Sequence, residues 1–340
     1  MTNNSLKIGL LGAGRIGMVH ASTIAYRVPS AQLIAVADVN EAAAKACAEK
    51  YRIPQTGGDP LKIINDPEIN AVLICSNTDS HTPLIKAAAA AGKHVFCEKP
   101  VAMTLPDVDA ALAAVAKAGV QLQIGFNRRF DANFARIKQA ITQGQIGEPQ
   151  IIHIVSRDPA PPPIAYVRTS GGLFIDMAIH DFDMARFLTG SEVDEVYVQA
   201  DVKVDKAIGE AGDVDTAVTL LRFANGMIGT IDNSRKAVYG YDQRVEVFGS
   251  DGAISTENNY PNNTTLSTAN AVQRDLPLNF FMQRYIEAYA TEIEQFVNAI
   301  INKQPVPVTG HDGKMAFVIG LAAKTSWAER RPVRITEIKA

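Results

Sequence analysis

The apolar run Leu6–Leu11 leads directly into Gly12-Ala-Gly14-Arg-Ile-Gly17, a glycine spacing that only a few folds can use. A strand that ends in G-x-G-x-x-G and continues as a helix is typical of a dinucleotide-binding turn. In such a turn Gly12 permits the tight bend, and Gly14 lets the backbone approach a pyrophosphate. Gly17 lets the helix lie close to the strand, and the helix N-terminus offers free N–H groups to the phosphates. The segment therefore predicts a nucleotide site at the start of the chain.

A second apolar run, 33–37, ends at Asp38, about 20 residues after the last glycine. An acidic side chain at this place hydrogen-bonds the ribose hydroxyls of NAD and repels the additional phosphate of NADP. No lysine or arginine follows Asp38 at once to accept that phosphate. NAD is the predicted cofactor, and NADP stays open because Lys45 or Arg15 could reach the site.

Composition is that of an ordinary globular protein large enough for two domains. The chain has 340 residues, 47% hydrophobic and 20% charged, and a formal net charge of −3. A chain without a basic footprint is not expected to bind nucleic acid. Neither 1–5 nor a later stretch has the pattern of a leader or a membrane span, so no membrane association is expected. The cysteines Cys47, Cys75 and Cys97 lack C-x-x-C spacing, and Cys75 and Cys97 lie in apolar strand-like runs that favour buried thiols; a cytoplasmic location is expected.

The first 126 residues alternate apolar strand-like runs with helical segments, many of them rich in alanine. This order predicts an α/β domain, a doubly wound parallel sheet of Rossmann type with helices on both faces. Ligands of such sheets bind beyond the carboxyl ends of the strands. Strands are expected at 6–11, 32–38, 71–76, 93–97 and 121–126, and helices at 15–26, 41–51, 83–91 and 106–118.

From about residue 148 strands follow one another closely, an α+β order that predicts a large, mostly antiparallel open sheet. Asn225-Gly226 indicates a tight hairpin, and the proline run 159–163 is too stiff for a strand and predicts a loop. We therefore divide the chain into an NAD-binding Rossmann domain, 1–126, and a substrate-binding and oligomerisation domain, 127–340. In the latter, strands are expected at 150–156, 193–204, 216–223, 227–234, 244–248 and 253–255, and helices at 281–302 and 312–330.

Glu98-Lys99-Pro100 ends a predicted parallel strand on the cofactor side of the sheet. Proline biases Lys99 toward an extended conformation and stops the strand there. The ammonium group would then cross the cleft and bind or polarise a substrate hydroxyl. A solvated lysine in a turn is the alternative interpretation.

A glycine loop at Gly171-Gly172 precedes a segment that has the pattern of a single helix closed by Gly190. Asp176 and His180 are four residues apart and share one face of that helix. A carboxylate beside an imidazole orients it and raises its basicity, which suits a general base that accepts a proton from an alcohol. The alternative is an aspartate that favours the helix dipole and a structural histidine.

The polar segment 77–83 follows another strand and offers hydroxyl and amide groups near the cofactor. Ser80 or Thr82 suits a helix cap, and His81 suits a helix start better than a catalytic role. The histidines and cysteines show no metal-ligand spacing, so no metal is expected. Neither a G-x-S-x-G motif nor a P-loop occurs, and hydrolase or phosphoryl-transfer chemistry has no motif to support it.

Five segments resemble, in this order, those of the Gfo/Idh/MocA oxidoreductases, and the resemblance extends over essentially the whole chain. They are the glycine turn 12–17, Asp38, the segment 76–81, Glu98–Pro100 and Asp176 with His180. Within that family the chain is most similar to inositol 2-dehydrogenases, through segments 125–131, 156–159 and 239–242.

The resemblance implies NAD-dependent oxidation of a secondary hydroxyl of a cyclitol, myo- or scyllo-inositol, to a ketone. It implies that Lys99, Asp176 and His180 catalyse together. The histidine takes the hydroxyl proton, the lysine and aspartate hold and polarise the oxygen, and the hydride leaves the same carbon for the nicotinamide. Such a transfer needs a dry, oriented approach, which the protein supplies together with the base.

The resemblance also implies which residues bind the ligands. The expected cofactor-binding residues are Gly12, Gly14, Arg15, Ile16, Asp38, Ser76, Asn77, His81, Glu98 and Lys99. A polyol requires donors and acceptors at fixed angles, and the expected substrate-binding residues are Lys99, Arg129, Arg157, Asp158, Asp176, His180 and Tyr239. Arg128 could exchange roles with Arg129, Asp158 could cap the proline loop, and Tyr241 could replace Tyr239.

Other functions stay open at this point. Some inositol dehydrogenases carry other residue types where this chain has 156–158, so a pyranose substrate such as glucose or an anhydrosugar is an alternative. A regulatory protein that senses NAD without turnover is a second alternative, although it has no need for the three catalytic residues. An oxidoreductase that recycles tightly bound NADP is a third, but no basic residue stands beside Asp38. Family members commonly pair the open faces of their second-domain sheets, and a homotetramer is expected.

Overall fold

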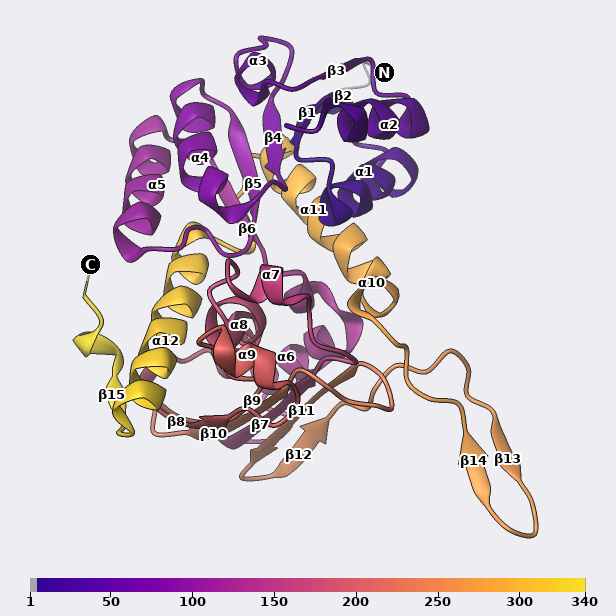
Figure 1. The fold of residues 1–340 in the computed structure, drawn as a ribbon, viewed down its shortest axis with the longest axis vertical. Helices are drawn as coiled ribbons and strands as arrows, with labels where there is room; N and C mark the ends of the chain where they lie inside the picture. The colour runs from indigo at the N-terminus through magenta and orange to yellow at the C-terminus, as the bar shows by residue number, and fades with distance from the viewer. Residues whose placement is uncertain (1–4, 340) are drawn as a thin grey trace. The chain divides into compact units, whose positions relative to one another are not determined.

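A computed structural model describes residues 5–339 of the chain (Figure 1). Residues 1–4, most of the segment in which the sequence predicts no leader, lie outside this range, as does Ala340. Within the described range, no helix combines the length and the apolar character that crossing a membrane requires.

The chain forms two compact units, and the first is not one continuous segment. It runs to Phe130 and also includes Glu287–Met315, whereas the second consists of Asp131–Ile286 and Ala316–Lys339. The sequence predicts a boundary at 126/127, which lies close to the crossing after Phe130. The return of residues 287–315 to the first unit was not predicted.

The first unit contains the predicted parallel sheet, whose six strands have the order β3-β2-β1-β4-β5-β6. This order, with β1 central and the chain winding outward in both directions, confirms the doubly wound Rossmann fold. The short strand β3 was not predicted. The strands are β1 Leu6–Leu11, β2 Ala31–Ala37, β3 Gln55–Gly57, β4 Ala71–Ile74, β5 His94–Glu98 and β6 Leu122–Gly125.

Helices cover both faces of this sheet, with α1 and α11 on one face and α4 and α5 on the other (Figure 1). Their ends follow local signals. Asn40 caps α2 through its side chain, and α5 begins after Thr104 and ends at Gly119, which has a φ of 67°. The helices are α1 Arg15–Arg27, α2 Glu41–Tyr51, α3 Pro60–Ile64, α4 His81–Ala90, α5 Leu105–Ala118 and α11 Ile286–Ile301, with short 3₁₀ turns at Thr78–Ser80 and Asn127–Phe130.

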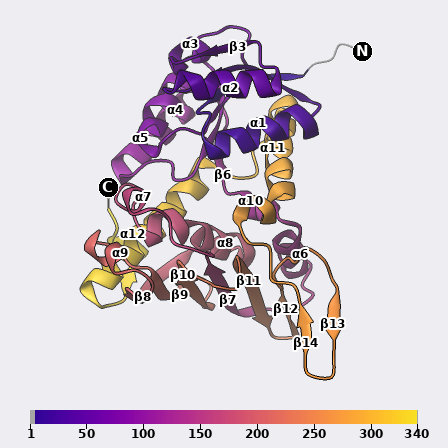
Figure 2. The ribbon, with the colours of Figure 1, turned by 45° about the vertical axis from the view of Figure 1, so that its right-hand side comes forward.

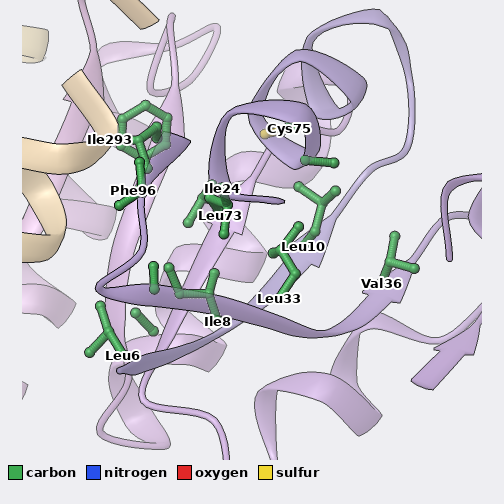
Figure 3. Packing of buried hydrophobic residues seen from close by; sticks show 14 of the residues in the cluster. Leu6, Ile8, Leu10, Ile24, Leu33, Val36, Leu73, Cys75, Phe96 and Ile293 are labelled. Atoms are coloured by element: carbon green, nitrogen blue, oxygen red, sulfur yellow. The ribbon is translucent and has the colours of Figure 1, made fainter. Parts of the chain in front are cut away.

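A buried hydrophobic cluster explains why the chain returns to the first unit. Ile293 of α11 packs beside Phe96 of β5, together with residues of β1 and β2 (Figure 3). The rings of Phe96 and Phe296 meet edge to face, with centroids 5.8 Å apart. Full burial of such side chains is worth about 1.5–3 kcal/mol each, so α11 completes this face of the core. The buried thiol of Cys75 lies in the same cluster, as the sequence predicts.

The second unit is built on a seven-stranded sheet with the order β12-β11-β7-β10-β9-β8-β15. All neighbours are antiparallel except β10 and β7, which confirms the predicted, mostly antiparallel sheet. The predicted hairpin joins β9 to β10 through Gly226, whose φ is 89°. The strands are β7 Pro149–Arg157, β8 Val193–Asp201, β9 Thr216–Phe223, β10 Ile228–Ser234, β11 Asp242–Gly249, β12 Gly252–Ser255 and β15 Val333–Arg334.

Helices α6 and α8 lie on one face of this sheet, and the other face is open in the part of the chain that the structure describes (Figure 2). Alternation along β9 follows this arrangement, because Thr219 and Leu221 are buried while Val218 and Leu220 are each 48% exposed. The helices are α6 Ala132–Thr142, α7 Ile164–Val167, α8 Ile179–Thr189, α9 Lys206–Glu210 and α10 Phe281–Arg284; α12, Gly310–Glu329, begins in the first unit and ends in the second.

Several elements differ from the sequence prediction. The helix expected at 281–302 is divided at Tyr285, a buried residue that leaves helical geometry between α10 and α11. Helix α6 was not predicted, although Asp131 caps it and its apolar residues have helical spacing. The hairpin β13 Thr265–Ser267 and β14 Val272–Arg274, which projects from its unit (Figures 1 and 2), was also not predicted. The proline run 159–163 forms no helix or strand, as expected.

Candidate functional site

The glycine turn has the close contacts that its spacing requires. Gly12 has a φ of 103°, and a Cβ there would lie 2.6 Å from the Ser76 backbone nitrogen. A Cβ on Gly17 would lie 2.0 Å from the carbonyl oxygen of Gly12. Gly14, which precedes α1, differs, because a Cβ there would meet no described atom within 4 Å. Two glycines are thus required by the protein itself, and the third leaves open space at a helix N-terminus, as a phosphate-binding turn requires.

Asp38 lies directly beyond β2 and braces this turn. Its Oδ2 accepts the Ala13 backbone N–H at 2.7 Å, and its Oδ1 accepts that of Asn40 at 2.8 Å. A carboxylate oxygen has two lone pairs, so both oxygens can also accept a bond from a ribose hydroxyl. Asp38 is half-buried and the neighbouring Val39 is 94% exposed, so the carboxylate is accessible at the surface of the turn.

The segment after β4 is connected to the segment after β5 by a buried histidine. The Nδ1 of His81 lies 2.8 Å from the carbonyl oxygen of Pro100, and its Nε2 lies 3.0 Å from that of Ser76. Burial lowers the pKa of His81, and the two carbonyls offset this only in part. His81 is 1% exposed, so it joins the two loops, which agrees with the structural role expected from the residues. Its contact with a cofactor stays a prediction.

Glu98 and Lys99 stand at the carboxyl end of β5. Glu98 Oε1 lies 2.7 Å from Nε2 of the fully buried His20, and Lys99 is half-buried and precedes a cis peptide bond to Pro100. A Cβ on Gly125 of the next strand would lie 2.9 Å from Glu98 Oε2, so the glycine makes room for this carboxylate. Neither His20 nor Gly125 was predicted to take part.

The remaining cofactor candidates lie on the same edge of the first sheet. Arg15 is exposed at the first position of α1, and Ile16 is half-buried against the core cluster. Ser76 bonds Ser80 between their hydroxyl oxygens at 2.6 Å, and Asn77 is exposed before the 3₁₀ turn. The first unit therefore gathers the predicted residues after β1, β2, β4 and β5, where ligands of such sheets bind.

Arg129, a predicted substrate residue, forms a partly buried ion pair within the first unit. Its Nη2 lies 2.9 Å from Oδ1 of Asp312, near the start of α12. Burial would raise the pKa of Asp312, but the Arg129 charge and the bonds from Thr309 outweigh it and lower that pKa to about 2. Arg128, the alternative, is buried. A contact between Arg129 and substrate stays a prediction.

In the second unit, Asp176 lies in a segment that is not the regular α-helix predicted from the sequence. Gly171 and Gly172 have φ values of 85° and 82°, and Leu173–Met177 then form a π-helical turn before α8. Single π turns inside helices are frequent at functional sites. His180 is the second residue of α8 and is half-buried.

Two side chains that the sequence did not single out hold the Asp176 carboxylate. Tyr166 Oη donates to Oδ1 at 2.8 Å, and Arg235 Nη1 donates to Oδ2 at 3.1 Å. Arg235 Nη1 also lies 3.8 Å from Oδ2 of Asp158, so one guanidinium lies beside two predicted carboxylates. Tyr166 follows the proline run and Arg235 follows β10, and no spacing pattern relates either to Asp176.

The register of β7 places Arg157, together with its partner Tyr239, on the face of the sheet that does not pack against α8. Ser156 of β7 is buried on the inner face, where its neighbour Asn233 donates to Asp181 of α8 at 2.8 Å. The next residue, Arg157, therefore points to the outer face. There its guanidinium pairs with Asp232 and donates to Tyr239 Oη at 3.0 Å.

The hydrogen bonds from Arg157 to Tyr239 continue to Asp242, whose carboxylate is fully buried. Tyr239 Oη donates to Asp242 Oδ2 at 2.6 Å, and Arg244 and Asn258 donate to the same carboxylate. Burial would raise the pKa of Asp242, but these bonds outweigh it and lower the pKa. A substrate role for Arg157 and Tyr239 stays a prediction, and the register gives them a structural role on the outer face.

Within residues 5–339, no group of three or more histidine, cysteine, aspartate or glutamate side chains is placed to hold a metal ion.

Comparison with known families gives a match in each of the two units. Residues 6–126 match the family described as "Oxidoreductase family, NAD-binding Rossmann fold", and residues 134–255 match the "GFO/IDH/MocA C-terminal domain". The chain belongs to the Gfo/Idh/MocA oxidoreductase family.

Its similarity to individual Gfo/Idh/MocA proteins extends over the full length. The chain is 48% identical to a myo-inositol 2-dehydrogenase of Thermotoga maritima, over 98% of this chain and 99% of that protein. It is 46% identical to an inositol 2-dehydrogenase of Rhizobium meliloti, over 97% and 99%. Among solved structures, a scyllo-inositol dehydrogenase of Lactobacillus casei with bound NAD(H) and scyllo-inositol is 30% identical, with a TM-score of 0.92 over 98% of this chain and 99% of that one.

Proposed function

We propose that this Gfo/Idh/MocA protein oxidises one secondary hydroxyl of a cyclitol, myo- or scyllo-inositol, to the ketone with NAD as the hydride acceptor. Full-length relatives named as inositol dehydrogenases support the substrate class. The observation that carries the proposal is the held carboxylate of Asp176, four residues before His180, in a chain that also has a Rossmann glycine turn. A protein that only senses NAD would not need this arrangement.

The first unit has the residues to hold NAD, which supplies the nicotinamide carbon that takes up the hydride. The space at Gly14 and the N-terminus of α1 suit the pyrophosphate, and Asp38 suits the ribose hydroxyls. Arg15, Ile16, Ser76, Asn77, His81 and Glu98 complete the proposed cofactor-binding set. The negative charge of Asp38 disfavours the additional phosphate of NADP.

Lys99, Asp176 and His180 would carry the chemistry. His180 accepts the hydroxyl proton, because neutral imidazole is a base suited to neutral pH. Lys99 and Asp176 hold the substrate oxygen, and the ammonium stabilises negative charge that develops on it as the proton leaves. As the C–H bond breaks, its electron pair leaves with the hydrogen and the C–O bond becomes a carbonyl.

The substrate hydroxyls away from the reacting carbon need further donors and acceptors. Asp158 is the best supported candidate, because Arg235 lies beside both its carboxylate and that of Asp176. Arg129 is retained as a second candidate on the basis of the family resemblance. For Arg157 and Tyr239, a substrate-binding role is supported by the family resemblance alone.

We also propose that the protein is a cytoplasmic homotetramer. The open sheet face of the second unit exposes Val218, Leu220, Ile228 and Phe248, each between 46% and 55%. Apolar side chains gathered on one face of a sheet favour pairing with a second copy. Light scattering at several protein concentrations would test the tetramer, and a monomer at all of them would contradict it.

Initial rates of NADH formation test the proposed activity. The panel contains myo-inositol, scyllo-inositol, other inositol isomers, glucose and an anhydrosugar, each with NAD and with NADP. Reduction of NAD with one inositol at a rate well above that with the pyranoses is the expected result. Preference for a pyranose would change the substrate, and no turnover despite NAD binding would favour a sensor.

A further inference from the structure

We infer that Arg235 is a positioning residue, which fixes the direction of the Asp176 carboxylate and connects it to Asp158. The inference rests on the proposed function, in which Asp176 and His180 act on the substrate hydroxyl. Neither the family resemblance nor any sequence pattern singles out Arg235.

The contacts of Arg235 point to this role. Its Nη1 lies 3.1 Å from Asp176 Oδ2 and 3.8 Å from Asp158 Oδ2, and the residue is only 2% exposed. The guanidinium orients the Asp176 carboxylate, because its planar N–H groups donate only in fixed directions, and its positive charge lies beside the Asp158 carboxylate. The direction of Asp176 is therefore set by a side chain that directly follows β10.

The backbone around Arg235 is held by hydrogen bonds on both sides, which fixes the point where its side chain begins. Its own N–H donates to the carbonyl oxygen of Asp215 at 2.8 Å. The N–H of Asp158 donates to Ser234 at 2.9 Å, and the N–H of Ala237 donates back to Asp158 at 2.6 Å. These backbone hydrogen bonds join the segment of Asp158 to the segment of Arg235. The backbone position of Arg235 is therefore fixed relative to Asp158.

Two nitrogens of Arg235 take no part in its ion pairs. Nε and Nη2 are buried without a hydrogen-bond partner among the described residues. A buried donor left unpaired destabilises a fold. The contacts that Arg235 does make are those of Nη1 with Asp176 and Asp158, which agrees with a role in orienting a carboxylate.

Tyr166 holds the second oxygen of Asp176 from another direction. Its hydroxyl donates to Oδ1 at 2.8 Å, and Tyr166 lies in α7, directly after the stiff proline run. With donors on Oδ1 and Oδ2 from two separate segments, the carboxylate cannot turn without breaking one bond. Tyr166 is 48% exposed, so its hydroxyl can be removed with little effect on packing.

The experiment measures kcat and KM for R235M, R235K and Y166F with NAD and the inositol that the wild type oxidises. We expect kcat to fall about 100-fold in R235M, because small misplacements of a catalytic group have effects of that order. R235K should recover part of this loss through its charge, and Y166F should lose about fivefold, in proportion to one neutral hydrogen bond. The KM for NAD should stay within about twofold in all three, because the change concerns the reacting oxygen and not the cofactor.

A matched control separates positioning from loss of a buried ion pair. Arg284 is also buried and pairs with Asp131, the cap of α6. R284M should lower the unfolding temperature as R235M does, yet keep kcat within about threefold of the wild type. Equal losses of kcat in R284M and R235M would mean that general destabilisation causes the loss in R235M, and this would overturn the inference.

The remaining outcomes are distinct. An active wild type with kcat of R235M within twofold of normal overturns the role of Arg235 and leaves the proposed function standing. If R235M does not fold, an unchanged kcat in Y166F together with an unchanged kcat in R235K overturns it. A wild type that oxidises no inositol overturns the proposed function and this inference together.

Discussion

The two units hold their functional side chains in different ways. In the first unit the polar groups around the glycine turn bind mainly to backbone, since Asp38 accepts the N–H groups of Ala13 and Asn40. Both nitrogens of His81 also face backbone carbonyls. In the second unit, by contrast, side chains hold Asp176, with Tyr166 on one oxygen and Arg235 on the other.

This difference has a physical consequence. A backbone donor is present whatever residue occupies the position, so the nucleotide half tolerates substitution around its motif residues. A side-chain donor is lost with one mutation, which leaves a buried carboxylate without its partner. We therefore expect activity to depend on scattered side chains in the second unit and on a few motif positions in the first.

The largest effect is expected from removing His180, the proposed general base in the second unit. His180→Ala should lower kcat by about 10²–10⁴-fold, the usual contribution of a positioned general base. NADH binding, measured by fluorescence titration, should survive. His153→Ala is the matched control, because His153 is exposed on β7 and bonds Thr230. Near-normal turnover of His180→Ala would end the general-base assignment.

A smaller effect is expected at Asp38, where charge and backbone bracing can be separated. Asp38→Asn keeps an oxygen for the turn but removes the charge, so discrimination against NADP should fall about tenfold, which corresponds to ~1.4 kcal/mol. Asp38→Ala should reduce discrimination against NADP equally. It should also weaken NAD binding, because the bonds from the N–H groups of Ala13 and Asn40 are both lost. Binding of both cofactors is measured by calorimetry. Unchanged preference in both variants would contradict the role of Asp38.

The Arg129–Asp312 pair is an exception to this difference between the units, because here the first unit also relies on two side chains. The pKa of Asp312 is lowered to about 2, so the ionised form stabilises the fold above about pH 4, and this stabilisation is lost as pH falls toward 2. Relative to Asp312→Asn, the wild type should be more stable by about 1–2 kcal/mol at pH 6. Urea unfolding at pH 6, 4 and 3 measures the difference. A difference that does not shrink on acidification would contradict the ion pair's role.

The smallest effect is expected on the outer face of the second sheet. Tyr239→Phe removes the hydroxyl between Arg157 and Asp242, while Arg244 and Asn258 still bind that carboxylate. We expect a stability loss of about 0.5–1.5 kcal/mol and less than a twofold change in KM for inositol. Steady-state kinetics and thermal unfolding measure both. A tenfold rise in KM would instead restore the substrate role that the family resemblance implies.

Local patterns in the sequence predicted the fold of the first unit well. The glycine turn, Asp38 and the alternating strands and helices depend on backbone geometry and short spacings, which one chain segment contains by itself. The short β3 and α3 were missed because a few residues carry little periodic signal. Helix α6 was missed although its cap and apolar spacing were present.

The partners of Asp176 could not be predicted, because they come from separate segments that only the folded sheet brings together. Arg235 follows β10 and is buried, whereas Tyr166 follows the proline run and is half-exposed. The same register places Arg157 on the outer face, and the strand bounds alone did not reveal which face packs against α8. The π turn at 173–177 likewise has no pattern that distinguishes it from an α-helix.

The most direct test of the central claim follows the hydrogen itself. The wild type is supplied with NAD and with the inositol that it oxidises, deuterated at every carbon, and the cofactor product is examined by mass spectrometry. The account predicts reduced cofactor one mass unit heavier than normal, formed more slowly than with unlabelled inositol. Reduced cofactor without deuterium, or none at all despite confirmed NAD binding, would contradict hydride transfer from the inositol carbon.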